Sequence, residues 1–176
     1  MIPILETDRL KLHPLSTQFI SDKYVDWMND PDVIEYLDSG GDYSLEKLNS
    51  YLKEVEKRPQ FFWAISIKET GVHVGNIKID PIHSIDQFGE FGIMIGDRNA
   101  WGKGIAKEAS EIILDYCFKT LSLRKINLGV LSSNNKAIKL YKILSFEQEG
   151  YFKNHVKHNN EFIDTIRMTI FNPYIK

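Results

Sequence analysis

The sequence predicts a single domain of mixed α/β class over residues 1–176. Apolar residues recur at every second position in some segments and at helical spacing in others, and the two kinds of segment alternate along the chain. The composition is typical of a globular protein, since 43% of the residues are hydrophobic and 26% are charged. Neither a repeat nor a low-complexity tract divides the chain, so we expect one α+β domain.

The first half of the chain is predicted to contain a strand, two helices and a hairpin. Its segments are a strand at 8–14, helices at 16–28 and 44–57, and hairpin strands at 61–68 and 72–80. The hairpin turns at Glu69-Thr70-Gly71, where glycine supplies the backbone freedom that a tight turn requires.

The second half is predicted to contain two strand-to-helix units and two closing strands. These are strand 88–96, helix 103–121, a strand around 126–130, a short helix opened by Asn134, and strands 146–152 and 161–171. Helix 103–121 is amphipathic and is expected to cover a sheet. Its apolar stripe includes Cys117, the only cysteine, which we interpret as a buried core thiol rather than a nucleophile.

Charge and hydropathy exclude several classes of function. The net charge of −2 argues against a nucleic-acid surface, which would normally show a basic patch. No apolar run approaches the roughly 20 residues that a membrane-spanning helix requires. Residues 1–8 lack the basic segment and apolar core of a signal peptide, so we predict a cytoplasmic protein.

The segment from Glu90 to Ala106 predicts an anion site, because a strand runs through a glycine-containing turn into a helix. Gly102 and Gly104 let the backbone approach a ligand, and the first helical turn leaves amides unpaired. A pyrophosphate fits such a site. The spacing excludes a P-loop, since five residues separate Gly96 from Gly102, and Lys107 stands where a dinucleotide fingerprint needs its third glycine. An ordinary glycine-bearing turn remains the alternative.

Two motifs in this order resemble those of the GNAT acetyltransferase superfamily. Residues 99–104 are similar to its acetyl-CoA pyrophosphate arm, and residues 134–146 to its downstream motif, in which an Asn opens a helix, a Tyr follows seven residues later and Gly-Phe ends it. Residues 7–12 resemble the opening strand of the branch that acetylates ribosomal-protein N-termini, and spermidine acetyltransferases look similar across the second half. The chain departs from these patterns at Asn99, where Gln or Arg is usual, and at Ser145, where Gly is usual.

The resemblance implies a single GNAT-type domain with a central, mostly antiparallel sheet of six to seven strands and about four flanking helices. It implies acetyl-CoA as co-substrate and no metal. The implied cofactor-binding residues are Met94, Ile95, Asn99, Gly102, Lys103, Gly104, Ile105, Ala106, Asn134 and Lys136. Lys103 is also compatible with a solvated lysine, and Asn134 with a helix cap.

Tyr141 and Glu90 are the candidate catalytic residues. Amine acetylation needs a base for the ammonium and an acid for the departing thiolate, and the position of Tyr141 in the family motif implies the acid. Periodicity alone favours a core position for Tyr141. Glu90 lies beside a glycine on the predicted cofactor strand and is a candidate base, with a solvated strand-face charge as the alternative. His155 and His158 make a poor metal site.

The expected acceptor is a small-molecule amine or a peptide N-terminus. The segment 22–47 carries eight carboxylates against two lysines and would attract a cation. Its acidic residues are Asp22, Asp26, Asp30, Asp32, Glu35, Asp38, Asp42 and Glu46. The aromatic residues Trp27, Tyr36, Tyr43 and Trp63 would instead favour an amino sugar, unless they belong to the core. We predict no nucleic-acid or membrane partner, and a homodimer is compatible with the sequence. The alternative function is a non-catalytic acyl-CoA-binding domain.

Overall fold

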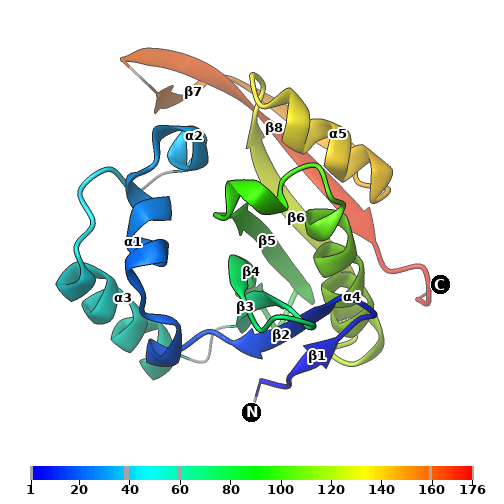
Figure 1. The fold of residues 1–176 in the computed structure, drawn as a ribbon. Coiled ribbons are helices and arrows are strands. Elements are labelled where there is room, and N and C mark those ends of the chain that lie inside the picture. The colour runs from blue at the N-terminus through cyan, green and yellow to red at the C-terminus, as the bar shows by residue number, and fades with distance from the viewer. Residues whose placement is uncertain (1, 38–39, 59–60, 159, 176) are drawn as a thin grey trace. The chain divides into compact units, whose positions relative to one another are not determined.

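The computed structural model describes residues 2–37, 40–58, 61–158 and 160–175, and Figure 1 shows their arrangement along the chain. In this part of the chain, eight strands have the order β1-β2-β3-β4-β5-β6-β8-β7. The pairs are antiparallel except for β5 and β6, which run parallel, in all pairs whose register is defined. The mixed, mostly antiparallel sheet is confirmed. The described residues form one strand and one α-helix more than predicted, namely β1 (Leu5–Glu6) and α2 (Pro31–Ile34).

The chain forms two compact units. The first comprises Met1–Asp80 and Gly92–Ile112, and the second comprises Pro81–Phe91 and Ile113–Lys176. Strands β4 (His73–His83) and β5 (Phe88–Ile95) and helix α4 (Ile105–Lys119) each contribute residues to both. No helix in the described ranges combines the length and the apolar character that crossing a membrane requires.

In the first unit, strands β2 (Leu10–Pro14) and β3 (Phe61–Ile67) form antiparallel neighbours, and the predicted hairpin joins β3 to β4. Gly71 has a φ of +69° in its turn, and its N–H donates to the carbonyl of Ile67 at 2.8 Å. That left-handed backbone is accessible to glycine at little cost, which explains why the turn falls where it was predicted.

The predicted helix 16–28 is wrong in one respect, because the structure divides it. A 3₁₀ turn, η1 (Thr17–Phe19), precedes helix α1 (Asp22–Asn29). Ser21 lies in an extended conformation between them, and its side chain accepts a hydrogen bond from the N–H of Tyr24. A serine cap satisfies an amide that would otherwise have no helical partner, so it starts a new helix. Helix α3 (Leu45–Lys57) begins after the Ser44 cap, close to the predicted position.

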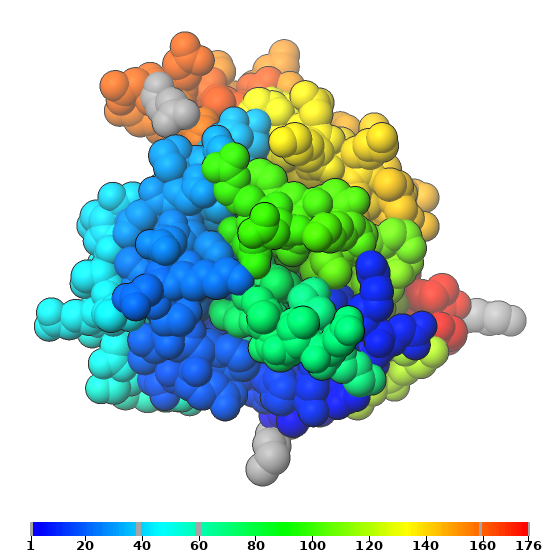
Figure 2. Space-filling model, viewed as in Figure 1, coloured from blue at the N-terminus to red at the C-terminus, as the bar shows by residue number. Residues whose placement is uncertain are grey.

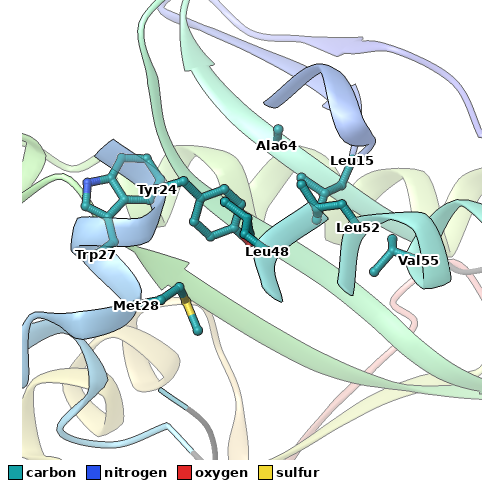
Figure 3. Close-up of a cluster of buried hydrophobic side chains, with 8 residues drawn as sticks. All are labelled: Leu15, Tyr24, Trp27, Met28, Leu48, Leu52, Val55 and Ala64. Atoms are coloured by element: carbon teal, nitrogen blue, oxygen red, sulfur yellow. The ribbon is translucent and has the colours of Figure 1, made fainter. Parts of the chain in front are cut away.

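The core of the first unit lies between α1, α3 and strand β3 (Figure 3). Figure 3 shows the three side chains of α3, Leu48, Leu52 and Val55, in a row along the inner face of that helix. Their i, i+4 and i+3 spacing places them on one stripe. The cluster consists of Leu15, Tyr24, Trp27, Met28, Leu48, Leu52, Val55 and Ala64.

The second unit contains β6 (Lys125–Leu131), α5 (Asn135–Ile143), β7 (Glu147–His158) and β8 (Glu161–Phe171). Strand β6 pairs in parallel with the beginning of β5 and antiparallel with β8, and β8 pairs with β7. Strand β7 ends six residues later than predicted, since it reaches His158 rather than residue 152. Most of its side chains are exposed, so the alternation that marks a half-buried strand is missing there.

Candidate active site

The predicted pyrophosphate arm, Asn99–Ala106, lies in the first unit. Gly102 has a φ of +71° and Gly104 a φ of +77°. Helix α4 follows directly, and its first helical bond runs from the N–H of Glu108 to the carbonyl of Gly104 at 3.1 Å. The N–H groups of residues 105–107 therefore have no acceptor within the helix. They point outward from its N-terminus, which is the positive end of the helix dipole. This geometry suits an anion.

Residues 101–104 are exposed, and Figure 2 shows part of the green segment that contains them at the surface. A Cβ built on Gly102 would have no atom within 4 Å. The protein itself therefore leaves room for a side chain at this position. The left-handed backbone favours glycine, and the lack of a side chain leaves the amides accessible to a ligand.

A short 3₁₀ turn, η2 (Arg98–Ala100), leads into the arm and is held by Asp97. The Asp97 carboxylate accepts from the N–H of Asn99 at 2.9 Å and from Lys23 Nζ at 2.5 Å. Burial opposes ionisation of Asp97, but Lys23 and Asn99 outweigh it and hold the pKa of Asp97 below its usual value. The side chain of Asn99 is exposed, so replacing the usual Gln or Arg leaves the backbone of the turn intact.

Arg9 anchors the arm from β2's N-terminal side, a contact that sequence reasoning missed. Its Nη1 donates to the carbonyl of Lys103 at 3.0 Å, and its Nε donates to Glu108 at 2.7 Å. The Thr7 hydroxyl also donates to the Glu108 carboxylate. Burial opposes ionisation of Glu108, yet Thr7 and Arg9 hold its pKa below the usual value. The anchor thus links residues 7–9 to the arm and to the first turns of α4.

The end of strand β5 packs tightly against the first unit's core. Met94 is packed against the cluster drawn in Figure 3, and the indole Nε1 of Trp101 donates to the carbonyl of Ile95 at 2.7 Å. A Cβ on Gly96 would lie 2.2 Å from the Trp27 ring. The Trp27 ring therefore explains the glycine at 96. This agrees with the sequence analysis, in which Gly96 is not the first glycine of a P-loop. Cofactor contacts by Met94 and Ile95 stay predictions.

Tyr141 lies in the second unit, on helix α5, and is 8% exposed. Its ring meets Phe91 edge to face at a centroid distance of 5.9 Å and Phe146 at 5.8 Å. Burial raises the pKa of Tyr141 to about 12. The core position that periodicity favours is confirmed, and burial extends to higher pH the range in which the phenol stays protonated.

Helix α5 has well-formed ends. The Asn134 side chain accepts from the N–H of Ala137 at 3.1 Å, so its predicted capping role is confirmed, while its pantetheine contact and that of the exposed Lys136 stay predictions. At the other end Ser145 has a φ of 68°. The N–H of Ser145 donates to the carbonyl of Lys142 at 3.0 Å, and the N–H of Phe146 donates to the carbonyl of Tyr141 at 2.9 Å. Those two bonds define a Schellman turn with serine in the place usual for glycine.

Glu90 is paired rather than freely solvated. Arg167 Nη2 donates to its two carboxylate oxygens at 2.7 and 3.0 Å. Sequence reasoning missed Arg167, although it is a lone basic residue between Thr165 and Thr169 on the polar positions of β8. Elsewhere in the second unit, burial raises the pKa of the Cys117 thiol to about 12, in agreement with a core thiol.

The acidic segment of the first unit is partly neutralised. Arg98 Nη1 lies 2.8 Å from Asp32 and 3.5 Å from Asp30, and Lys47 lies 2.5 Å from Asp42. Asp38 falls outside the described residues. Trp27 and Trp63 are buried in the core, which removes two of the four aromatic faces considered for a sugar.

Comparison with known proteins identifies similar sequences and folds. The model of the acetyltransferase (GNAT) domain matches residues 9–147. A spermidine N(1)-acetyltransferase of Escherichia coli (strain K12) is 29% identical over 92% of this chain and 86% of its own length. The crystal structure of the Vibrio cholerae spermidine N-acetyltransferase with CoA and spermine aligns with a TM-score of 0.83 at 26% identity, covering 94% of this chain and 97% of that one. The ribosomal-protein-S5-alanine acetyltransferase of Vibrio fischeri shares the fold, with a TM-score of 0.85 at 19% identity over 99% of both chains.

Proposed function

The chain belongs to the GNAT acetyltransferase family and is an acyltransferase, and from this premise we propose that it transfers the acetyl group of acetyl-CoA to a primary amine. The observation that carries the proposal is the arm, with left-handed glycines at 102 and 104 in front of the unpaired amides that open α4. Main-chain amides and the helix dipole favour the pyrophosphate of a CoA molecule. Asn99, Lys103, Ile105 and Ala106 complete the proposed contact segment.

The proposed reaction needs three proton transfers. The acceptor ammonium first loses a proton to Glu90, directly or through water. Its nitrogen then attacks the thioester carbonyl, so that a C–N bond forms and the C–S bond breaks. The departing thiolate takes the phenolic proton of Tyr141. The nitrogen loses its second proton as the neutral amide forms, and this proton restores the Tyr141 phenol through solvent. Burial raises the pKa of Tyr141 to about 12, so the phenol holds its proton until the thiolate departs.

The acceptor class follows from charge. Two relatives are named for spermidine, and exposed carboxylates remain on the acidic segment at Asp22, Asp26 and Glu46. Such a surface attracts ammonium groups and repels phosphates. We therefore rank a small cationic amine or a peptide N-terminus ahead of a nucleotide-linked amino sugar.

The test is release of free thiol from acetyl-CoA in the presence of spermidine, short peptides or a UDP-linked amino sugar, each at the same concentration. Turnover with spermidine or a peptide is expected. Preference for the UDP sugar would overturn the ranking. Tight acetyl-CoA binding without turnover of any amine would contradict the transfer reaction and favour the acyl-CoA-binding alternative.

A further inference from the structure

In the second unit, three residues from three strands share one face of the sheet. Glu90 on β5 pairs with Asn127 on β6, and Gly129 on β6 pairs with Arg167 on β8. Residues two apart on a strand lie on the same face, and paired residues of neighbouring strands face the same way. Glu90, Gly129 and Arg167 therefore form one cluster on the face opposite to that of Phe91.

The ion pair in this cluster uses only part of each group. One guanidinium nitrogen, Arg167 Nη2, donates to the two oxygens of Glu90 at 2.7 and 3.0 Å. A carboxylate offers about four lone-pair positions, so two remain after this contact. The side chain of Glu90 is 25% exposed, which leaves the carboxylate accessible to a second donor from solvent.

Gly129 provides the space in which the guanidinium lies. A Cβ at this position would be 3.3 Å from Arg167 Nη1 and 3.6 Å from the Thr165 methyl group. A distance of 3.3 Å is tighter than an ordinary contact, so a larger side chain would displace the guanidinium. Gly129 is exposed and lies within a strand, where glycine weakens the element. Its presence is explained by the position of Arg167.

We infer that Arg167 is a positioning residue, which fixes the Glu90 carboxylate for the acceptor amine. This inference rests on the proposed function. The proton passes from the acceptor nitrogen to a Glu90 oxygen, where an O–H bond forms as an N–H bond breaks. Arg167 takes no part in the proton transfer itself. It acts by restricting the rotamers of Glu90, and orientation of a reacting group contributes strongly to rate.

The matched control is a second ion pair of the same unit. Lys125 Nζ on β6 lies 2.9 and 3.0 Å from the two oxygens of Glu149 on β7, so it also binds a carboxylate of another strand of the same sheet. Lys125 is only 15% exposed, and its loss should cost stability at least as much as an exposed pair does. It has no part in the proposed reaction. Lys125→Met therefore measures the kinetic effect of losing an ion pair as such.

The experiment compares Arg167→Met, Arg167→Lys, Gly129→Val and Lys125→Met with the unmodified protein, using kcat and KM for spermidine and for acetyl-CoA, together with Tm. Arg167→Met should lower kcat/KM for spermidine about tenfold or more while KM for acetyl-CoA changes less than about twofold. Arg167→Lys should recover part of the loss. Gly129→Val keeps the charges of Glu90 and Arg167, and valine is favoured in strands. Because its side chain displaces the guanidinium, it should also lower kcat/KM for spermidine, by a smaller factor. This variant serves as the test if Arg167→Met does not fold.

Equal kinetics for Arg167→Met and Lys125→Met, at similar Tm, would overturn the inference while leaving the proposed function intact. If Arg167→Met does not fold, unchanged kcat/KM in Gly129→Val would overturn it in the same way. Absence of turnover with every amine in the unmodified protein would overturn both the proposed function and this inference.

Discussion

The arm of the first unit and the turn that ends α5 in the second unit both use left-handed backbone, but with different residues. The arm has glycine at 102 and 104, with φ of +71° and +77°. The α5 turn has Ser145 at a φ of 68°. In the α5 turn the amides of Ser145 and Phe146 are bonded back to the helix, whereas the amides that follow Gly104 precede the first helical bond.

This difference separates two uses of the same backbone conformation. A turn that satisfies its own hydrogen bonds tolerates the strain of a serine, because the strain costs only about 1–2 kcal/mol. A turn whose amides are to face a ligand needs glycine both for its conformation and for the approach of the ligand. The glycine of the family pattern is therefore dispensable at 145, and we predict that it is required at 102.

The largest expected effect comes from removing the phenol while the α5 turn is kept. Tyr141→Phe should reduce turnover about 10²-fold or more with little change in acetyl-CoA affinity, since phenylalanine preserves the contacts with Phe91 and Phe146. The measurement is steady-state thiol release together with acetyl-CoA binding. Turnover within about twofold of the unmodified protein at every pH would return Tyr141 to a purely structural role.

The pH profile of the unmodified protein follows from the raised pKa of Tyr141. The acid is active when protonated, and it loses its proton only as the pH rises through about 12. Activity should therefore persist through pH 10, where an unperturbed tyrosine would be half ionised, and the alkaline loss should come later. A decline centred at or below pH 10 that is absent from Tyr141→Phe would contradict the assignment.

A smaller effect is expected from loosening the arm without changing its glycines. Arg9→Met removes the donors to Lys103 and Glu108, and hydrogen bonds between charged groups contribute about 1.5 kcal/mol or more, so acetyl-CoA affinity should fall about tenfold. Lys119→Met is the matched control, because it breaks the exposed Lys119–Asp115 pair at the C-terminal end of the same helix. Equal affinities for the two variants would show that the anchor has no role in binding.

The smallest effect concerns the tolerant turn. Ser145→Gly relieves about 1–2 kcal/mol of left-handed strain in the folded state. It also costs about 0.5–1 kcal/mol, because glycine loses more conformational entropy on folding. The free energy of unfolding should therefore rise by roughly 0.5–1 kcal/mol. Urea denaturation measures this, with unchanged turnover expected. Destabilisation by Ser145→Gly would show that the serine side chain contributes to the turn.

Local patterns in the sequence predicted most of the fold. Periodicity placed α3, α4 and the hairpin of β3 and β4 within a few residues, because each element carries its own apolar stripe or alternation. It failed at the 16–28 segment, where the Ser21 cap overrides a continuous apolar pattern. It also failed for the second half of β7, whose exposed side chains give no alternation.

The site was less accessible to sequence reasoning because its ion pairs join distant residues. Arg9 and Glu108 are 99 positions apart, and Glu90 and Arg167 are 77 apart. Nothing in the spacing of a single sequence indicates that such residues meet. The glycines of the arm and the Asn134 cap were predictable, since a left-handed turn and a helix N-terminus each impose a local residue type.

The most direct test compares acetyl-CoA affinity in Gly102→Ala and Ser145→Ala. Each variant places an alanine at a left-handed position, and no protein atom lies within 4 Å of the new Cβ at 102. We predict that Gly102→Ala raises the Kd for acetyl-CoA about tenfold or more, which corresponds to a loss of about 1.4 kcal/mol or more of binding free energy. The Kd of Ser145→Ala should stay within about twofold of that of the unmodified protein. Unchanged affinity in a folded Gly102→Ala protein would contradict the assignment of the arm as the pyrophosphate site.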